Sequence, residues 1–144
     1  MVRVTISPIG GEVTALAKLL LVEDEPAHFA LYKRFLAEDG HEIVGAQCGE
    51  EAISVAKRFC PSVVVLDLVL PDMDGTEAIS RLLCECGQPK IVINTGYESF
   101  RYNFKCWGAD AFVVKSSDPS ELRAKVRQVL KPALGKGIKG VERN

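Results

Sequence analysis

Five short apolar runs rich in β-branched residues punctuate the chain, and they constrain its fold more than any other feature. The runs are residues 18–22, 42–46, 62–66, 90–94 and 111–114. Each is continuously apolar rather than alternating, which is typical of strands buried on both faces of a sheet. The segments between them show helical spacing, as in Ala52, Val55 and Phe59. Strands that alternate with helices predict βαβ units, and therefore an α/β fold with a parallel sheet.

Residues with known preferences for helix ends support the same arrangement. Asp118, Pro119 and Glu121 have the spacing of an N-cap, a first helical proline and a capping-box glutamate. Gly40 and Gly108 follow helical stretches, where a left-handed residue is expected to end a helix. The segment 98–107 carries four aromatic side chains and is less regular, but we also expect a helix there.

The strands and helices account for one domain over residues 17–132, a three-layer (βα)5 unit rather than a barrel. Residues 1–16 contain Pro8 and a Gly10-Gly11 pair, which predicts a loosely ordered extension. Residues 133–144 contain three glycines and no hydrophobic periodicity, so we expect a tail or the start of a linker. No DNA-binding, RNA-binding or catalytic unit is recognisable after residue 132. The chain is therefore expected to be either a stand-alone domain or one part of a longer protein.

Composition excludes several classes of function. A net charge of −1 does not favour a nucleic-acid-binding surface. No apolar run approaches the roughly 20 residues of a membrane-spanning helix, and the first 14 residues do not resemble a secretory signal. The five cysteines are odd in number and irregularly spaced, which fits a reducing cytoplasm better than a disulfide framework. Cys84 and Cys86 form a Cys-x-Cys pair, but no second Cys or His pair accompanies it.

Polar groups follow four of the five predicted strands. Glu23 and Asp24 follow the first strand, Asp67 the third, Thr95 the fourth and Lys115 the fifth. Function in an open parallel sheet collects at the carboxyl ends of the strands, so we expect these side chains to meet in one crevice.

Three carboxylates in one crevice repel one another unless a cation lies among them. Carboxylate oxygens with open positions suit Mg²⁺, or Mn²⁺ in its place. The three negative charges of Glu23, Asp24 and Asp67 would be balanced by the ion and Lys115. The site would then have no net charge, so it would not repel an incoming phosphoryl group, as phosphoryl transfer requires.

Four stretches together resemble the receiver domains of response regulators in two-component phosphorelay systems. They are residues 19–26, which read LLLVEDEP, residues 63–75, which read VVVLDLVLPDMDG, residues 93–96, which read INTG, and residues 108–115, which read GADAFVVK. The similarity extends over residues 18–131. It implies a flavodoxin-like, doubly wound parallel sheet with the five strands in the spatial order 2-1-3-4-5.

The resemblance also implies a role for each matching residue. Asp67 is expected to be the phosphoacceptor, and Thr95 and Lys115 are expected to bind the phosphoryl oxygens. Mg²⁺ is expected to be bound by Asp24, Asp67 and the backbone carbonyl of Val69, with Glu23 acting directly or through water. The small Gly96 would leave room for the phosphate.

Further positions match the residues that control switching and signal lifetime in this family. Thr95 and the aromatic Phe112 are expected to couple the site to a surface formed by residues 98–107, the strand 111–114 and the helix after residue 119. Val69 and Tyr97 flank the path of the hydrolytic water. Neither is suited to orient that water, so we expect slow autodephosphorylation.

The resemblance makes a cytoplasmic signalling domain, not an enzyme, the expected function. Its partners would be a histidine kinase or phosphotransfer protein, and a second copy or an output protein on the switching surface. No nucleic acid and no membrane are expected to contact this domain.

Two departures from the family pattern leave alternatives open. Glu23 replaces the usual aspartate, and Ser116 stands where the family has a proline after a cis peptide bond. Lys115 therefore either keeps that costly bond or is presented by a different loop.

Three other functions are open to this chain. A pseudo-receiver that binds partners without phosphorylation is the main alternative. An aspartyl-nucleophile phosphatase needs a second aspartate where Val69 stands. A flavodoxin-like electron carrier would place a flavin phosphate against the acidic residues 23–25.

Overall fold

A central five-stranded parallel sheet organises the protein, whose computed structural model describes residues 3–6 and 13–131. Its strands are β3 (Lys18–Val22), β4 (Glu42–Ala46), β5 (Val63–Leu66), β6 (Lys90–Thr95) and β7 (Ala111–Val114). They lie in the order β4-β3-β5-β6-β7, and every neighbouring pair is parallel. Counted along the chain, this is the order 2-1-3-4-5, so the predicted α/β fold is confirmed.

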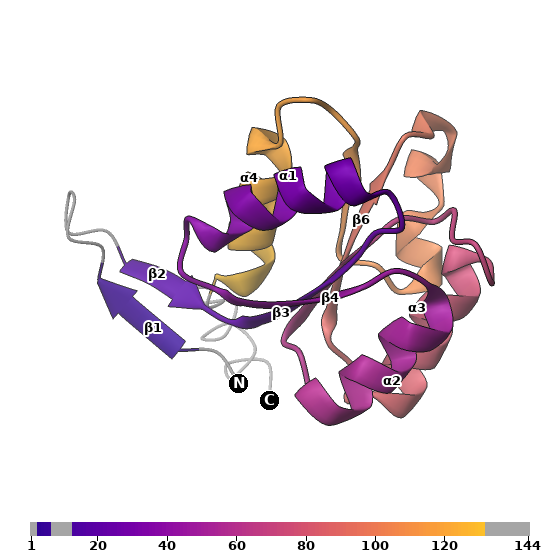
Figure 1. The fold of residues 1–144 in the computed structure, drawn as a ribbon, viewed down its shortest axis with the longest axis horizontal. Coiled ribbons are helices and arrows are strands. Elements are labelled where there is room, and N and C mark those ends of the chain that lie inside the picture. The colour runs from indigo at the N-terminus through magenta and orange to yellow at the C-terminus, as the bar shows by residue number, and fades with distance from the viewer. Residues whose placement is uncertain (1–2, 7–12, 132–144) are drawn as a thin grey trace, which may run out of the picture.

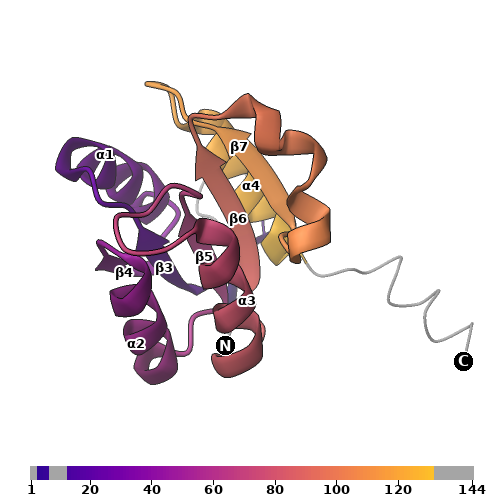
Figure 2. The same cartoon turned by 90° about the vertical axis from the view of Figure 1, so that its right-hand side faces the viewer.

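Helices cover both faces of the sheet and make three layers (Figures 1 and 2). One face carries α1 (Pro26–Ala37) and α4 (Ser120–Leu130). The other carries α2 (Gly49–Phe59) and α3 (Gly75–Glu85), followed by two short 3-10 helices. Two separate hydrophobic clusters fill the spaces between these layers.

The strand β3 shows why the central runs are apolar at every position. Leu20 and Val22 belong to the cluster under α2 and α3, whereas Leu19 and Leu21 belong to the cluster under α1 and α4. All four side chains are at most 1% exposed. Burial of both faces removes the alternation that a half-exposed strand would show.

The predicted helix ends are largely confirmed. Gly40 and Gly108 have φ angles of 88° and 89°, which places both in the left-handed region. The start of α4 differs from the prediction by one residue, because Pro119 has a ψ of 20° and the helix begins at Ser120. Asp118 still acts at this end, since its carboxylate accepts a hydrogen bond from the Ser120 N–H at 3.1 Å.

The segment 98–107 is not a single α-helix, so that prediction is wrong in detail. It forms the 3-10 helices η1 (Glu98–Tyr102) and η2 (Phe104–Trp107), separated at Asn103. Phe100 and Trp107 both pack against the core and meet edge to face at 5.9 Å. The tighter 3-10 turns allow both rings to reach inward from one short segment.

Before the parallel sheet, β1 (Arg3–Ile6) and β2 (Val13–Leu16) pair as an antiparallel two-stranded sheet. We predicted a loosely ordered extension there, so these two strands are a correction. Residues 1–2, 7–12 and 132–144 lie outside the described residues, and with them the predicted tail at 133–144. Within residues 3–6 and 13–131, no helix has the length and apolar character needed to cross a bilayer.

Candidate functional site

Lys115 brings together two of the predicted carboxylates at the carboxyl edge of the sheet. Glu23 follows β3 and Asp67 follows β5, and these two strands are neighbours. From the end of β7, the Lys115 Nζ lies 2.7 Å from Asp67 Oδ2 and 2.9 Å from Glu23 Oε1. The strand order thus places three residues, distant in sequence, in one ionic cluster.

This cluster is almost removed from solvent. The side chains of Glu23, Asp67 and Lys115 are only 2%, 9% and 15% exposed. Burial acts to lower the pKa of Lys115, but its hydrogen bonds to Asp67 and Glu23 outweigh burial and raise that pKa. The lysine is therefore held as a cation beside two carboxylates, which leaves the cluster with one excess negative charge.

The other predicted metal ligands lie nearer to solvent. Asp24 is exposed, and the Val69 side chain is half exposed. The Val69 N–H donates to Asp67 Oδ1 at 3.1 Å, which ties the backbone after β5 to the Asp67 carboxylate. Over the described ranges, no three His, Cys, Asp or Glu side chains stand together as a preformed metal group. Lys115 instead contacts the two buried carboxylates directly.

Thr95 ends β6, the strand next to β5, and is completely buried. Its carbonyl accepts a hydrogen bond from the Lys115 N–H at 2.8 Å. Among the described residues its hydroxyl Oγ1 has no hydrogen-bond partner. A buried hydroxyl without a partner is costly, so this donor is suited to an acceptor that arrives from outside.

Phe112 and Tyr97 occupy contrasting positions around the site. Phe112 is 2% exposed and packs against Phe104 with ring centroids 5.8 Å apart. The Arg101 guanidinium lies over the Phe112 ring, 5.2 Å from its centroid. Tyr97 is 56% exposed and contacts Phe100 at 6.0 Å. The predicted switch aromatic is therefore inside the domain, and the predicted lifetime residue is on its surface.

The loop that presents Lys115 contains no cis peptide bond, and neither does any other described part of the chain. The Ser116 hydroxyl accepts a hydrogen bond from the Asp118 N–H at 3.1 Å. Of the two alternatives left by the sequence, the structure has the different loop shape.

Sequence reasoning missed three residues next to this site. Tyr32 is buried, its hydroxyl is hydrogen-bonded to the Asn94 side chain, and its pKa is raised chiefly by burial. The charges of Lys115, Glu23 and Asp67 also act on that hydroxyl. The exposed His28 has its Nδ1 3.8 Å from Glu23 Oε2. Only Asn94 had a sequence signal, as a polar residue inside an apolar strand.

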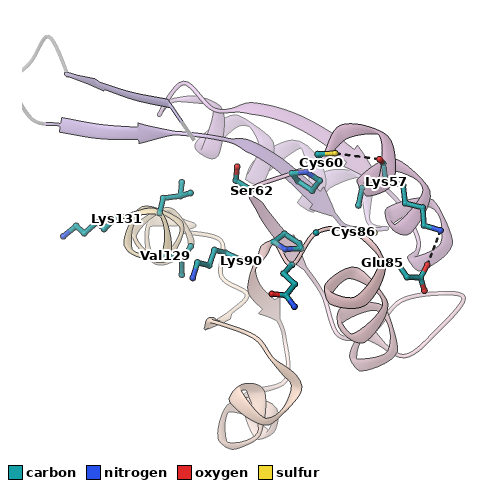
Figure 3. A pocket seen from close by; sticks show the side chains of 14 residues that line it. Lys57, Cys60, Ser62, Glu85, Cys86, Lys90, Val129 and Lys131 are labelled. Atoms are coloured by element: carbon teal, nitrogen blue, oxygen red, sulfur yellow. Dashed lines mark hydrogen bonds and ion pairs between the residues drawn. The ribbon is translucent and has the colours of Figure 1, made fainter. Parts of the chain in front are cut away.

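A hollow of about 840 Å³ lies at the opposite, amino edge of the sheet and contains none of these residues (Figure 3). Lys57 and Glu85 point toward each other at its rim and form an ion pair of 3.2 Å. Cys60 and Cys86 also line it, and all five cysteines are free thiols. The residues predicted to bind the metal and the phosphoryl group therefore lie away from this hollow.

Known proteins with related sequences are regulators. A probable transcriptional regulator ycf27 from Porphyridium aerugineum is 36% identical over 115 residues, which cover 79% of this chain and 48% of that protein. The alkaline phosphatase synthesis transcriptional regulatory protein PhoP of Bacillus subtilis is 31% identical over 116 residues, with the same coverage of both chains. The chain thus spans about half the length of these regulators.

Solved structures show the same architecture. The response regulator TrrA from Thermotoga maritima, in complex with Mg(2+)-BeF, has a TM-score of 0.72 and 35% identity, covering 78% of this chain and 98% of that one. A LuxR-family two-component response regulator from Aurantimonas sp. SI85-9A1 has a TM-score of 0.74 and 29% identity, covering 90% and 99%. The family model of the response regulator receiver domain matches residues 19–127. The chain belongs to the response regulator receiver family of two-component systems.

Proposed function

We propose that this domain accepts a phosphoryl group on Asp67, with Mg²⁺, from a histidine kinase or a phosphotransfer protein. One observation carries the proposal: the acceptor carboxylate is ion-paired to Lys115 beside a buried Thr95 hydroxyl that lacks a partner. These are an anionic nucleophile, a cation and a hydrogen-bond donor. Phosphoryl transfer needs these three groups, because positioning and charge stabilisation supply most of its catalysis.

The donor set fits a hard divalent cation. Asp67 and Glu23 are close enough to share one ammonium group, Asp24 follows Glu23 directly, and the cluster has a negative charge in excess. Asp24, Asp67 and the Val69 carbonyl would hold Mg²⁺ (or Mn²⁺), with Glu23 acting directly or through water. The ion would offset charge on the incoming phosphoryl group. The Mg(2+)-BeF complex of TrrA supports this assignment at the level of the family.

Asp67, Lys115 and Thr95 would each have a separate role in the phosphoryl transfer. An Asp67 carboxylate oxygen attacks phosphorus while the bond to the donor nitrogen breaks, so one phosphoryl group is exchanged and no net oxidation occurs. Lys115 moves its ion pair from the carboxylate to a phosphoryl oxygen, and the Thr95 hydroxyl donates to another. Asp67 becomes an acyl phosphate, and the donor histidine recovers a lone pair.

The proposed output is a rearrangement of the surface formed by η1, η2, β7 and α4. Thr95 and Phe112 would link this surface to the site, since Phe112 packs against Phe104 of η2. The phosphorylated state would favour a different packing of these elements, which would then engage a second copy or an output protein. Hydrogen-exchange changes confined to α1 and α2 would contradict this part.

The proposed signal is long-lived without a phosphatase. Val69 and Tyr97 are 50% and 56% exposed, and neither side chain is suited to hold an attacking water in line. Replacing Val69 by Asn and Tyr97 by Glu should speed loss of the phosphate once the donor is removed. Equal rates in the original protein and the double variant would refute this role.

Labelling with acetyl phosphate tests the central proposal. With Mg²⁺ the protein should gain one base-labile phosphoryl group, detected by intact mass, and Asp67→Asn should abolish it because the nucleophile is gone. Labelling that survives in Asp67→Asn would place the acceptor elsewhere. A protein that gains no label at any Mg²⁺ concentration would instead be an interaction module without phosphotransfer.

A further inference from the structure

The loop between β5 and α3 is held to the start of α2 by one carboxylate. Asp72 Oδ1 accepts a hydrogen bond from the Gly49 N–H at 2.8 Å, and Oδ2 accepts one from the Glu50 N–H at 2.9 Å. The residue at the N-cap of α2, Cys48, makes no side-chain capping bond. The first N–H groups of this helix are therefore satisfied from a loop more than twenty residues away in sequence.

A second contact fixes the same tip of the loop. The Met73 side chain covers Gly49 so closely that a Cβ atom at that glycine would lie 2.5 Å from Met73 Cγ. Asp72 and Met73 thus hold α2 by adjacent side chains, one polar and one apolar. The two Asp72 hydrogen bonds, from Glu50 and then Gly49, also hold the pKa of the carboxyl below its usual range.

The base of the loop is closed by its own backbone. The Gly75 N–H donates to the Leu68 carbonyl at 2.9 Å, and Val69 pairs with Asp74 in an isolated antiparallel bridge. Val69 therefore lies in a loop that is closed at its base and anchored at its tip. The only charged anchor at the tip is Asp72, among the contacts that the described residues make there.

We propose that Asp72 is a positioning residue for the metal site: by tying the loop to α2, it holds the Val69 carbonyl in place for Mg²⁺. This inference rests on the proposed function, in which that carbonyl is a ligand. Asp72 itself is exposed and its two oxygens are used by α2, so it acts through the loop rather than on the ion. Loss of a partner that orients a metal ligand typically costs about 10–100-fold in metal affinity or activity. Because Asp72 does not touch the reacting atoms, its loss should act through affinity.

A plain helix cap would affect stability alone, so the test separates metal affinity from stability. The labelling rate from acetyl phosphate is measured against Mg²⁺ concentration for the original protein, Asp72→Ala and Asp72→Asn. Asp72→Ala should raise the half-saturating Mg²⁺ concentration about tenfold, and the maximal rate should return at saturating Mg²⁺. Asp72→Asn should lie between, because its amide accepts from one N–H and offers only a donor to the other.

Asp110→Ala is the matched control. Its carboxylate accepts one backbone hydrogen bond, from the Ile91 N–H at 2.8 Å, at the amino edge of the sheet. This variant should lose thermal stability without any change in half-saturating Mg²⁺. If Asp72→Ala keeps the original half-saturation, or loses maximal rate at saturating Mg²⁺, the positioning role is overturned. Asp72→Asn carries the test if Asp72→Ala does not fold. If the original protein is not labelled at all, the proposed function fails rather than this inference.

Discussion

Two ionic clusters lie near the two ends of α1, and they differ in their numbers of acidic and basic groups. Near its start, one ammonium group, that of Lys115, serves the two carboxylates of Glu23 and Asp67. Just after its end, the single carboxylate of Asp39 accepts from the guanidinium groups of Arg123 and Arg127 at 2.7–3.0 Å.

Charge balance separates the two clusters. Glu38 also pairs with Arg123 at 2.9 Å, so among the described residues the cluster at the end of α1 has two acids and two bases and joins α1 to α4. The cluster at its start keeps an excess negative charge beside a buried hydroxyl without a partner. In the part of the chain that the structure describes, the cluster at the end of α1 is balanced by its own side chains, whereas the cluster at its start keeps a formal negative charge that an added cation would offset.

The largest expected difference between the clusters is in folding stability. Asp39→Ala should lower the free energy of unfolding by about 2–3 kcal/mol, because it removes several charge-assisted hydrogen bonds that join the end of α1 to α4. Asp67→Asn should cost less than about 1 kcal/mol, because it also relieves repulsion between carboxylates. Urea unfolding at neutral pH measures both, and equal losses would erase the distinction.

Mg²⁺ is expected to have a smaller effect on the free energy of unfolding. At ten times its dissociation constant, the ion should stabilise the original protein by about 1.4 kcal/mol. Asp39→Ala should keep this increment, because its cluster is at the far end of α1, and Asp67→Asn should lose most of it. Urea unfolding with and without MgCl₂ measures the increments. An increment lost in Asp39→Ala and kept in Asp67→Asn would reverse the assignment.

The smallest expected effect is the change, at acid pH, in the contribution of Asp39 to the free energy of unfolding. Burial acts to raise the pKa of Asp39, but hydrogen bonds from Arg127 and Arg123 outweigh it and lower that pKa below 3.8. The Asp39 carboxylate therefore stabilises the fold above its ordinary pKa, and this contribution is lost as the pH falls through the lowered one. The stability difference between the original protein and Asp39→Ala should shrink from pH 6 to pH 3. A difference that stays constant in acid would show that Asp39 acts by packing.

How much the sequence predicts depends on whether a feature is local or tertiary. The five central strands were predictable, because burial on both faces leaves a continuous apolar run, as at Val63–Leu66. Asp67, Thr95 and Lys115 were predictable as a group, because parallel strands end at one edge. The strands β1 and β2 were missed, although β-branched residues flank Pro8 and Gly10-Gly11.

Contacts between distant segments were not predictable in this way. The reach of Asp72 to Gly49 and the hydrogen bond of Tyr32 to Asn94 depend on how helices and loops pack, which no local pattern records. The segment 98–107 was predicted as a helix although its pattern is less regular than those of the other helical segments. Packing of Phe100 and Trp107 against the core then selects the turns.

Gly75 has no side chain that could react, yet its place in the fold makes it as irreplaceable as the proposed acceptor Asp67. A Cβ atom there would lie 2.4 Å from Leu68 Cα, so even alanine would force apart the backbone that follows β5. In a saturation library selected for signalling, positions 67 and 75 would both be depleted of every substitution. A second selection for cellular abundance alone would separate them, because substitutions at 67 would survive it and those at 75 would not. Intolerance to substitution can therefore reflect either a role in the reaction or a role in folding. Paired selections for signalling and for abundance distinguish the two.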